Sequence, residues 1–214
     1  MKKHSILKIF TVAAIGAMAL AGPARAGSFD SEAKQFVSSL GAKTAIMIGN
    51  EDTESEAERA QKLYGFVDNV VDVPAIARFT MGRYWRQASE QQRAEFKKLF
   101  RGYVAYSVAD RIKALAGASI KVQKVVPVKA SKAKDVLVIC RIEIRQGRSL
   151  AVVWRVRKTE AGPRLVDVIV DGISMAVVQR EEFASVIRAQ DGNIGSFLTA
   201  LREKTGGASM VAER

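Results

Sequence analysis

The fold is decided by residues 135–170, which read DVLVICRIEIRQGRSLAVVWRVRKTEAGPRLVDVIV. Apolar and polar residues alternate along most of this stretch, which is the period of a strand with one buried face. Tight turns are expected at Gly147 and at Gly162-Pro163, where turn-forming residues interrupt the alternation. The stretch therefore predicts three consecutive antiparallel strands that share an almost wholly apolar face. The side chains expected on that face are Val136, Val138, Cys140, Ile142, Ile144, Leu150, Val152, Trp154, Val156, Val166, Val168 and Val170.

Residues 33–71, which precede this stretch, have apolar side chains at the spacing of a helix instead. Apolar side chains recur every three or four residues from Ala33 to Met47 and again from Ala60 to Val71. Thr53 and Glu56 match the capping box that opens a helix, so the second of these helices is expected to begin there. Gly49-Asn50 is expected to end the first.

A short helix and a long helix are expected next. Pro74 suits the first turn of a helix that ends near Met81, and Ser89 with Gln92 makes a capping box for a helix that runs to about Leu115. One face of the long helix carries Phe96, Leu99, Phe100, Tyr103, Val104 and Ser107, and the other carries Arg93, Lys97, Lys98 and Arg101. The long helix is therefore strongly amphipathic.

The remaining segments complete a single α+β domain. Residues 120–128 are expected to form the fourth strand of the sheet, and two helices are expected at 180–189 and 194–204. Helices first and strands second, with no repeat or linker between them, favour N-terminal helices packed on a four-stranded antiparallel sheet, followed by two C-terminal helices.

Residues 1–26 have the form of a cleaved secretory signal peptide. Lys2, Lys3 and Lys8 supply a basic start, residues 9–20 supply an apolar run, and Ala24-Arg25-Ala26 matches a cleavage site. The apolar run is too short to span a hydrocarbon core of about 30 Å as a helix. We therefore expect a mature, exported protein of 188 residues, 27–214.

Composition excludes several kinds of chemistry. The chain has one cysteine, Cys140, and one histidine, His4, which lies in the expected signal peptide. Without an imidazole, the mature protein has neither a Ser-His-Asp nor a Cys-His centre, and no histidine to bind zinc or haem. Maturation leaves 30 basic and 22 acidic residues, a net charge of +8. Export argues against nucleic acid as the anionic partner, which leaves lipid headgroups, an acidic protein surface, or only a solvated basic surface.

Two segments carry a resemblance to a known family. Residues 72–100 read DVPAIARFTMGRYWRQASEQQRAEFKKLF, and residues 166–180 read VDVIVDGISMAVVQR, followed by Phe183. They resemble the two signature regions of the MlaC, or toluene-tolerance, family of periplasmic phospholipid-binding proteins, which includes hopanoid-associated relatives. Met81 and Asp171 stand where leucine and glutamate are usual, and Pro163 stands where tryptophan is often found.

The resemblance implies a curved sheet that encloses an apolar cavity for acyl chains, with the headgroup outside. It also implies shuttling of phospholipid between an outer-membrane lipoprotein complex and an inner-membrane ABC transporter, with transient contact at membrane surfaces. We expect a monomer without cofactor or metal and without enzymatic activity. The side chains expected to line the cavity are Val70, Ile76, Phe79, Trp85, Phe96, Leu99, Phe100, Tyr103, Val104, Val138, Ile142, Val152, Trp154, Val168, Val170 and Ile173. Candidate headgroup or partner contacts are Arg78, Arg93, Lys97 and Arg101.

Several alternatives remain open from the residues alone. The apolar residues could fill a solid core, as in a structural adaptor, and the ligand could be a hopanoid or another apolar lipid. Gly172-Ile173-Ser174-Met175-Ala176 resembles a degraded nucleophile elbow, which would suit a lipid hydrolase, but a turn is favoured because no histidine base survives maturation. Arg78 is expected to pair with Asp167 or Asp171, and Trp85 either wedges two helices apart or guards the cavity mouth.

Overall fold

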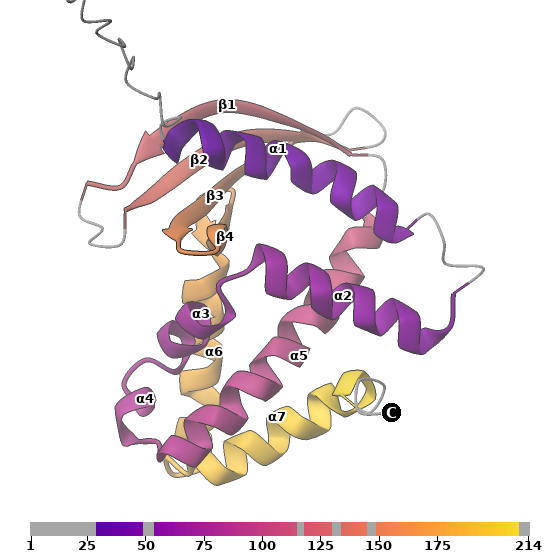
Figure 1. Cartoon of the computed structure of the whole chain (residues 1–214). Helices are drawn as coiled ribbons and strands as arrows, with labels where there is room; N and C mark the ends of the chain where they lie inside the picture. The colour runs from indigo at the N-terminus through magenta and orange to yellow at the C-terminus, as the bar shows by residue number, and fades with distance from the viewer. Residues whose placement is uncertain (1–28, 49–53, 115–117, 130–133, 145–148, 210–214) are drawn as a thin grey trace, which may run out of the picture.

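The computed structural model describes residues 29–48, 54–114, 118–129, 134–144 and 149–209 (Figure 1). The helices are α1 (Phe29–Ile48), α2 (Glu56–Val70), α3 (Val73–Met81), α4 (Tyr84–Gln87), α5 (Glu90–Ala114), α6 (Met175–Ala189) and α7 (Ile194–Ser209). The strands are β1 (Ser119–Pro127), β2 (Asp135–Glu143), β3 (Ser149–Thr159), β4 (Gly162–Val170) and β5 (Ile173–Ser174). The α+β class, the antiparallel meander and the order of helices agree with the sequence analysis. The expected signal peptide and the turns at Gly49-Asn50 and Gly147 lie outside the described residues.

The sheet is antiparallel, in the order β1-β2-β3-β4-β5, and is visibly curved (Figure 1). The prediction of four strands is wrong, because β5 adds a short fifth strand that pairs with the end of β4. The turn between them is Asp171-Gly172, whose φ values of 49° and 84° are both positive. Two positive φ values are the requirement of the tight hairpin turn that Asp-Gly favours, so Asp171 lies in a turn and not on a strand.

Two further details of the sheet differ from the prediction. The turn between β3 and β4 lies at residues 160–161, since Thr159 pairs with Gly162 and Lys158 with Pro163. Proline is tolerated in β4 because β5 pairs only with the far end of this strand. A bulge also shifts the register of β4, so that Leu165 instead of Val166 lies opposite Val156 on the apolar face.

Local hydrogen bonds explain where the helices begin. The Asp72 carboxylate accepts from the Ala75 N–H at 3.1 Å, so Asp72 caps α3 with Pro74 in the first turn, as predicted. Ser89 and Gln92 form the predicted capping box of α5. The capping box of α2 is formed by Ser55 and Glu58, two residues after the predicted pair Thr53 and Glu56. Ser55 and Glu58 have the same spacing as the predicted pair and lie nearer the first apolar turn of the helix. Ser174 caps α6, which therefore begins five residues before the predicted Arg180.

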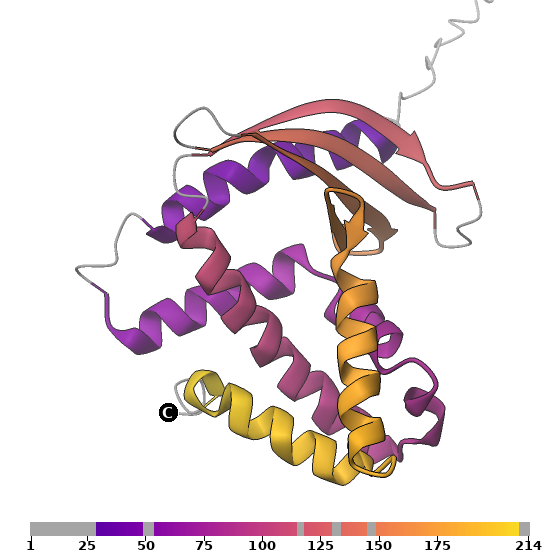
Figure 2. The ribbon, with the colours of Figure 1, turned by 180° about the vertical axis from the view of Figure 1, so that it is seen from behind.

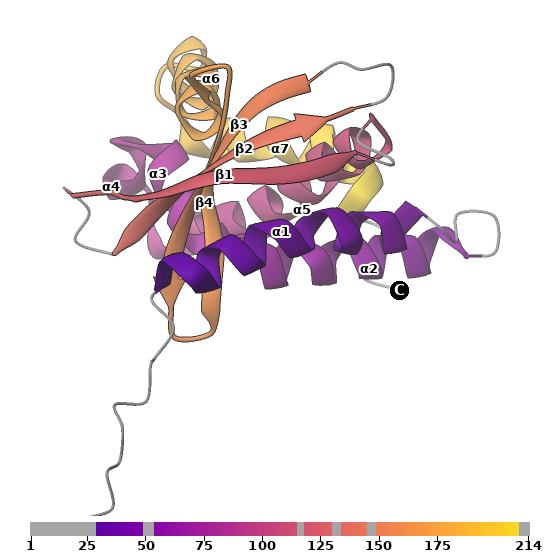
Figure 3. The same cartoon turned by 90° about the horizontal axis from the view of Figure 1, so that it is seen from above.

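The interior consists of two hydrophobic clusters. In the sheet cluster, α1 lies on the inner face of the sheet and packs chiefly against β1 and β2 (Figure 3). Its buried members are Ala33, Val37, Leu40, Val70, Val136, Val138, Cys140, Val156 and Leu165. In the helical cluster, α2 to α7 pack on one another below the sheet, with α7 lying across α5 (Figure 2). Phe66 and Val71 pack against both clusters and connect them.

Candidate functional site

The inner face of the sheet is apolar but is not covered equally. On β2, which lies under α1, Val138 and Cys140 are 0% and 1% exposed. On β3 and β4, Trp154 lies opposite Val168, and Val152 lies opposite Val170, so all four side chains share this face. Val152 is buried, whereas Trp154, Val168 and Val170 are only half-buried. Val156 of β3 and Leu165 of β4, which share this face, are also buried, so the uncovered half of the inner face is the part around Trp154, Val168 and Val170.

The uncovered half continues to the β4–β5 corner. Ile173 lies opposite Val170 and so points to the same face, yet 57% of its surface is exposed. Val177 and Val178, in the first turn of α6, are 47% and 38% exposed. Exposure of these aliphatic side chains to water is unfavourable, because burying apolar surface gains about 25 cal/mol of free energy per Å². This corner is consequently the part of the inner face that would gain most from an apolar ligand.

Helix α5 is connected to α6, the helix that follows the β4–β5 corner. Tyr103 and Val104 are half-buried and pack against the helical cluster. The Tyr103 hydroxyl donates to Oε1 of Gln179 at 2.6 Å, which ties α5 to α6 below the β4–β5 corner. Lys204 of α7 lies over the Tyr103 ring at 5.5 Å from its centroid.

The predicted cavity residues on the first half of α5 lie in a filled core. Phe96 is 0% exposed and its ring centroid lies 5.5 Å from that of Phe100, 5.8 Å from Phe183 and 5.9 Å from Phe197. Phe183 and Phe197 are also in contact, at 5.1 Å. Such distances are those of packed aromatic pairs. The predicted apolar cavity is therefore not confirmed as one space lined by both groups of residues: Phe96, Leu99 and Phe100 belong to the helical cluster, and Val138 and Ile142 are buried in the sheet.

The other candidate lining residues are spread over both clusters. Val70 is buried in the sheet cluster, while Ile76 and Trp85 pack against the helical cluster. Arg93 holds Trp85 in place, since its guanidinium lies 5.7 Å from the ring centroid and its Nε donates to the Trp85 carbonyl at 2.7 Å. This geometry favours Trp85 as a wedge between helices. Phe79 is 41% exposed on the surface of α3.

Two of the four candidate cationic residues have partners within the protein, and the other two are exposed. Arg93 and Arg101 are engaged within the protein: Arg101 forms a two-pronged ion pair with Asp68 and lies 4.3 Å from the centroid of the Tyr64 ring. Arg78 and Lys97 are exposed. The expected pairing of Arg78 with Asp167 or Asp171 is wrong: among the described residues Arg78 forms no ion pair, Asp167 is occupied by other donors, and Asp171 lies exposed in the β4–β5 turn.

Those donors give Ser174 a structural role. The Ser174 hydroxyl donates to Oδ2 of Asp167 at 2.5 Å and accepts from the Val177 N–H at 3.1 Å. Oδ1 of Asp167 accepts from the N–H groups of Val168 and Ala176. The cluster fixes the start of α6 against β4, as the turn interpretation of Ser174 predicts. Within the described residues, no group of histidine, cysteine, aspartate and glutamate side chains is placed to hold a metal ion.

A buried carboxylate on the outer side of the sheet escaped the sequence analysis. The Asp135 side chain is 0% exposed and accepts from Arg155 at 2.8 Å and from Arg157 at 2.9 Å. Burial alone would raise the pKa of Asp135, but the hydrogen bonds and charges of Arg157 and Arg155 outweigh it and hold the pKa below its ordinary value. Arg157 also lies 3.9 Å from Asp72, the cap of α3, so this group connects the sheet to the helices. The alternation itself contained the signal, since it sets an aspartate and two arginines on the same polar face.

Cys140 and Trp154 lie side by side on the inner face, where the Cys140 thiol donates to the Val138 carbonyl at 3.8 Å. Burial raises the pKa of Cys140 to about 11, with a smaller opposing contribution from the Trp154 side chain. The Nε1–H of Trp154 is buried and makes no well-formed hydrogen bond to the described residues. Cys140 is therefore an unreactive core residue, as predicted.

Helices on one face of a curved antiparallel sheet, with the apolar sheet face turned toward them, define the class of this fold. The same fold occurs in the solved structure of the phospholipid-binding protein from Ralstonia solanacearum in complex with a phospholipid, with a TM-score of 0.65 and 21% sequence identity. The match covers 83% of this chain and 98% of that chain. A model of the MlaC protein family matches residues 42–203, and the chain belongs to the MlaC family. No curated protein sequence matches it.

Proposed function

We propose that this protein is a periplasmic phospholipid carrier that passes lipid between an outer-membrane lipoprotein complex and an inner-membrane ABC transporter. Membership of the MlaC family and the fold shared with a phospholipid complex support phospholipid as the ligand. Carriage without catalysis agrees with the role of Ser174 as a helix cap. None of the described helices is long and apolar enough to cross a membrane.

The observation that carries the proposal is the uncovered half of the inner sheet face. Trp154, Val168 and Val170 remain half-buried although the same face is sealed on β2. Acyl chains laid on this half would remove its apolar surface from water. The ligand site that we propose is therefore narrower than the original set of lining residues: Val152, Trp154, Val168, Val170 and Ile173 from the sheet, with Tyr103 and Val104 from α5.

Energetics explain why a carrier needs such a surface. Two acyl chains contain on the order of 30 methylenes, and moving each from water to an apolar site gains about 0.8 kcal/mol. Release into water would therefore cost roughly 20 kcal/mol or more. A site almost as apolar as a bilayer makes exchange between protein and membrane close to neutral, so the carrier needs no energy source of its own.

The test is to extract the purified protein with organic solvent and to identify the extract by mass spectrometry. We expect a diacyl phospholipid, and we expect Val168→Trp to reduce the amount recovered per protein severalfold, because the indole fills the proposed site. Ile169→Trp is the matched control: Ile169 is the next residue of β4, is equally half-buried, and points to the outer face opposite Val153. Its lipid content should equal that of the unmodified protein.

Each other result has a definite meaning. A triterpenoid in the extract would replace the phospholipid with a hopanoid-type ligand. Recovery of no lipid at all would favour an adaptor with a filled core. Equal lipid loss in both variants, with both still folded, would show that the lipid does not lie on the inner face of β4.

A further inference from the structure

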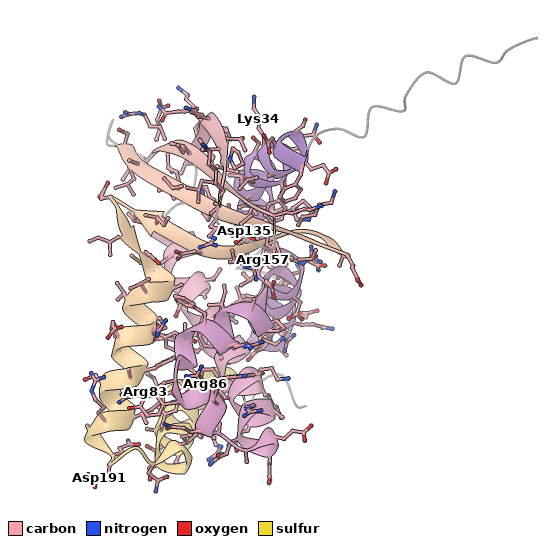
Figure 4. All side chains as sticks on the ribbon, turned by 90° about the vertical axis from the view of Figure 1, so that its left-hand side faces the viewer. Lys34, Arg83, Arg86, Asp135, Arg157 and Asp191 are labelled. Carbon is pink, nitrogen blue, oxygen red and sulfur yellow. The ribbon has the colours of Figure 1, made fainter. Side chains whose placement is uncertain are left out.

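The surface formed by α3 and α4 combines exposed cations with an exposed aromatic ring. Residues 73–88 contain Arg78, Arg83 and Arg86 and no carboxylate. All three arginines are exposed, and Arg83 and Arg86 lie close to each other on the side of the molecule that Figure 4 presents. Phe79 is 41% exposed on the same helix as Arg78. We call these four residues, together with Arg180 of α6, the α3–α4 face.

Arg180 joins α6 to this face. Its guanidinium lies 5.3 Å from the centroid of the Phe79 ring. Gly82 makes room for it, because a Cβ at that position would lie 3.0 Å from Nε of Arg180, and the φ of Gly82 is 53°. Val177, 47% exposed, precedes Arg180 by one helical turn and so lies on the same side of α6. The Phe79 ring and the Val177 side chain are thus both neighbours of Arg180.

Among the residues that the structure describes, the arginines of this face lack the carboxylate partners that several cations elsewhere in the protein have. On the outer face of the sheet, Lys121 pairs with Glu143, and Arg155 and Arg157 pair with Asp135. On α5 and α7, Arg101 pairs with Asp68 and Arg202 with Glu95. Within the described part of the chain, no arginine of the α3–α4 face forms an ion pair. Arg83 contacts the ring and the hydroxyl of Tyr84, and Arg180 contacts the ring of Phe79. The carboxylate of Glu182, on α6, accepts instead from Gln179, the residue that faces α5.

We infer that the α3–α4 face docks the protein on an anionic lipid bilayer. Arginines without carboxylate partners would bind phosphate groups at the membrane surface, while Phe79 and Val177 would enter the boundary between headgroups and acyl chains. Because α6 continues directly from β5, docking through this face would bring the β4–β5 corner close to the bilayer. The biological role of this docking rests on the proposed carrier function, but membrane binding can be measured whether or not the protein carries lipid.

The experiment is co-sedimentation of the purified protein with vesicles of phosphatidylglycerol, compared with vesicles of phosphatidylcholine. We expect binding to phosphatidylglycerol that weakens as salt is raised, and little binding to phosphatidylcholine. The double variant Arg78→Gln/Arg86→Gln should weaken the partition coefficient about fivefold for each arginine removed. Phe79→Ser should weaken it about tenfold, since the ring no longer enters the interface.

The matched control is Lys121→Gln/Arg141→Gln, which removes two exposed charges from the outer face of the sheet. It should retain most of the binding. Equal loss in the control would mean that the net charge and not this face attracts the vesicle, and would overturn the inference, as would full binding by Arg78→Gln/Arg86→Gln. Absence of vesicle binding together with capture of an acidic protein through the same arginines would overturn it too, in favour of a protein partner. Co-purified lipid, measured in the same samples, reports on the carrier function separately and should be unchanged in the double variant.

Discussion

The helical cluster and the sheet cluster are two different kinds of interior. In the helical cluster, four phenylalanine rings are packed with centroids 5.1–6.1 Å apart, and Phe96 is fully buried among them. The sheet cluster is built mostly from smaller side chains and extends to Val156 of β3 and Leu165 of β4. On the same face of these two strands, Trp154, Val168 and Val170 are only half-buried.

This difference separates the residues that stabilise the protein from those that would bind lipid. A core of interlocked rings has little room to accept a ligand without repacking, since interiors are as dense as molecular crystals. The inner sheet face, which the helices leave partly uncovered, still has apolar surface that a ligand could bury. Substitutions in the first region should therefore change stability, and substitutions in the second should change lipid content.

The largest effect on stability is expected for Phe96→Ala. Removing a ring that touches three other rings leaves a cavity and should lower the free energy of unfolding by about 3–5 kcal/mol. Urea denaturation followed by circular dichroism measures this loss. Lipid content per folded molecule should stay the same, and a selective loss of lipid would remove the distinction between the two clusters.

A smaller loss is expected for Asp135→Asn, which leaves Arg155 and Arg157 without their carboxylate. Because both arginines reach solvent, we expect a loss of about 2–3 kcal/mol at pH 7, below that of a fully buried pair. The folded-state pKa of Asp135 is lowered, so its stabilisation is present above the ordinary carboxyl pKa of 3.8 and disappears as the pH falls through the folded-state value. Denaturation of both proteins at several pH values should show curves that converge in acid. A constant difference down to the lowest pH would contradict the assignment.

The next effect concerns the joint between the sheet and α6. Ser174→Ala removes the helix cap and one hydrogen bond to Asp167, at a cost of about 1–2 kcal/mol. Thermal unfolding measures this change, and Ser174→Thr, which keeps the hydroxyl, should recover most of it. Ester turnover that Ser174→Ala abolishes in a still-folded protein would instead revive the hydrolase alternative.

The smallest effect is chemical. Because the pKa of Cys140 is raised to about 11 by burial, its thiol should stay unmodified by iodoacetamide at pH 8 in the folded protein. Unfolding in guanidinium should expose it to complete alkylation, as mass spectrometry of the intact chain would show. Rapid labelling of the native protein would mean that the sealed half of the inner face opens easily.

Periodicity was sufficient for the elements and for the faces of most strands. The alternation placed Val138 and Cys140 correctly in the core, and Pro74 and Ser89 marked the starts of α3 and α5. Periodicity was not sufficient where a bulge shifts the register between two strands, as between β3 and β4, where Leu165 and not Val166 lies opposite Val156. The Asp171-Gly172 pair is a hairpin signal in the sequence, whereas the sequence analysis predicts only a turn near Ser174 and no fifth strand.

The candidate site was harder to predict, for a different physical reason. Phe96 and Trp154 are both apolar residues on a buried face, and no local pattern says which of them is enclosed by other rings and which stays half-buried. That depends on how far α1 extends over the sheet and on how α5, α6 and α7 pack together, which are contacts between distant segments. Arg78 is a similar case, since its expected partner Asp167 is satisfied by Ser174 and by backbone N–H groups.

The most direct test of where lipid binds uses the two tryptophans, Trp85 and Trp154, as separate reporters. The protein is loaded with a phospholipid that carries bromine on its acyl chains, and fluorescence is measured in Trp85→Phe, which retains Trp154, and in Trp154→Phe, which retains Trp85. We predict strong quenching of Trp154, on the inner face of the sheet, and little quenching of Trp85, which packs against the helical cluster. Quenching of Trp85 alone, or no quenching of either residue in a lipid-loaded protein, would contradict the account.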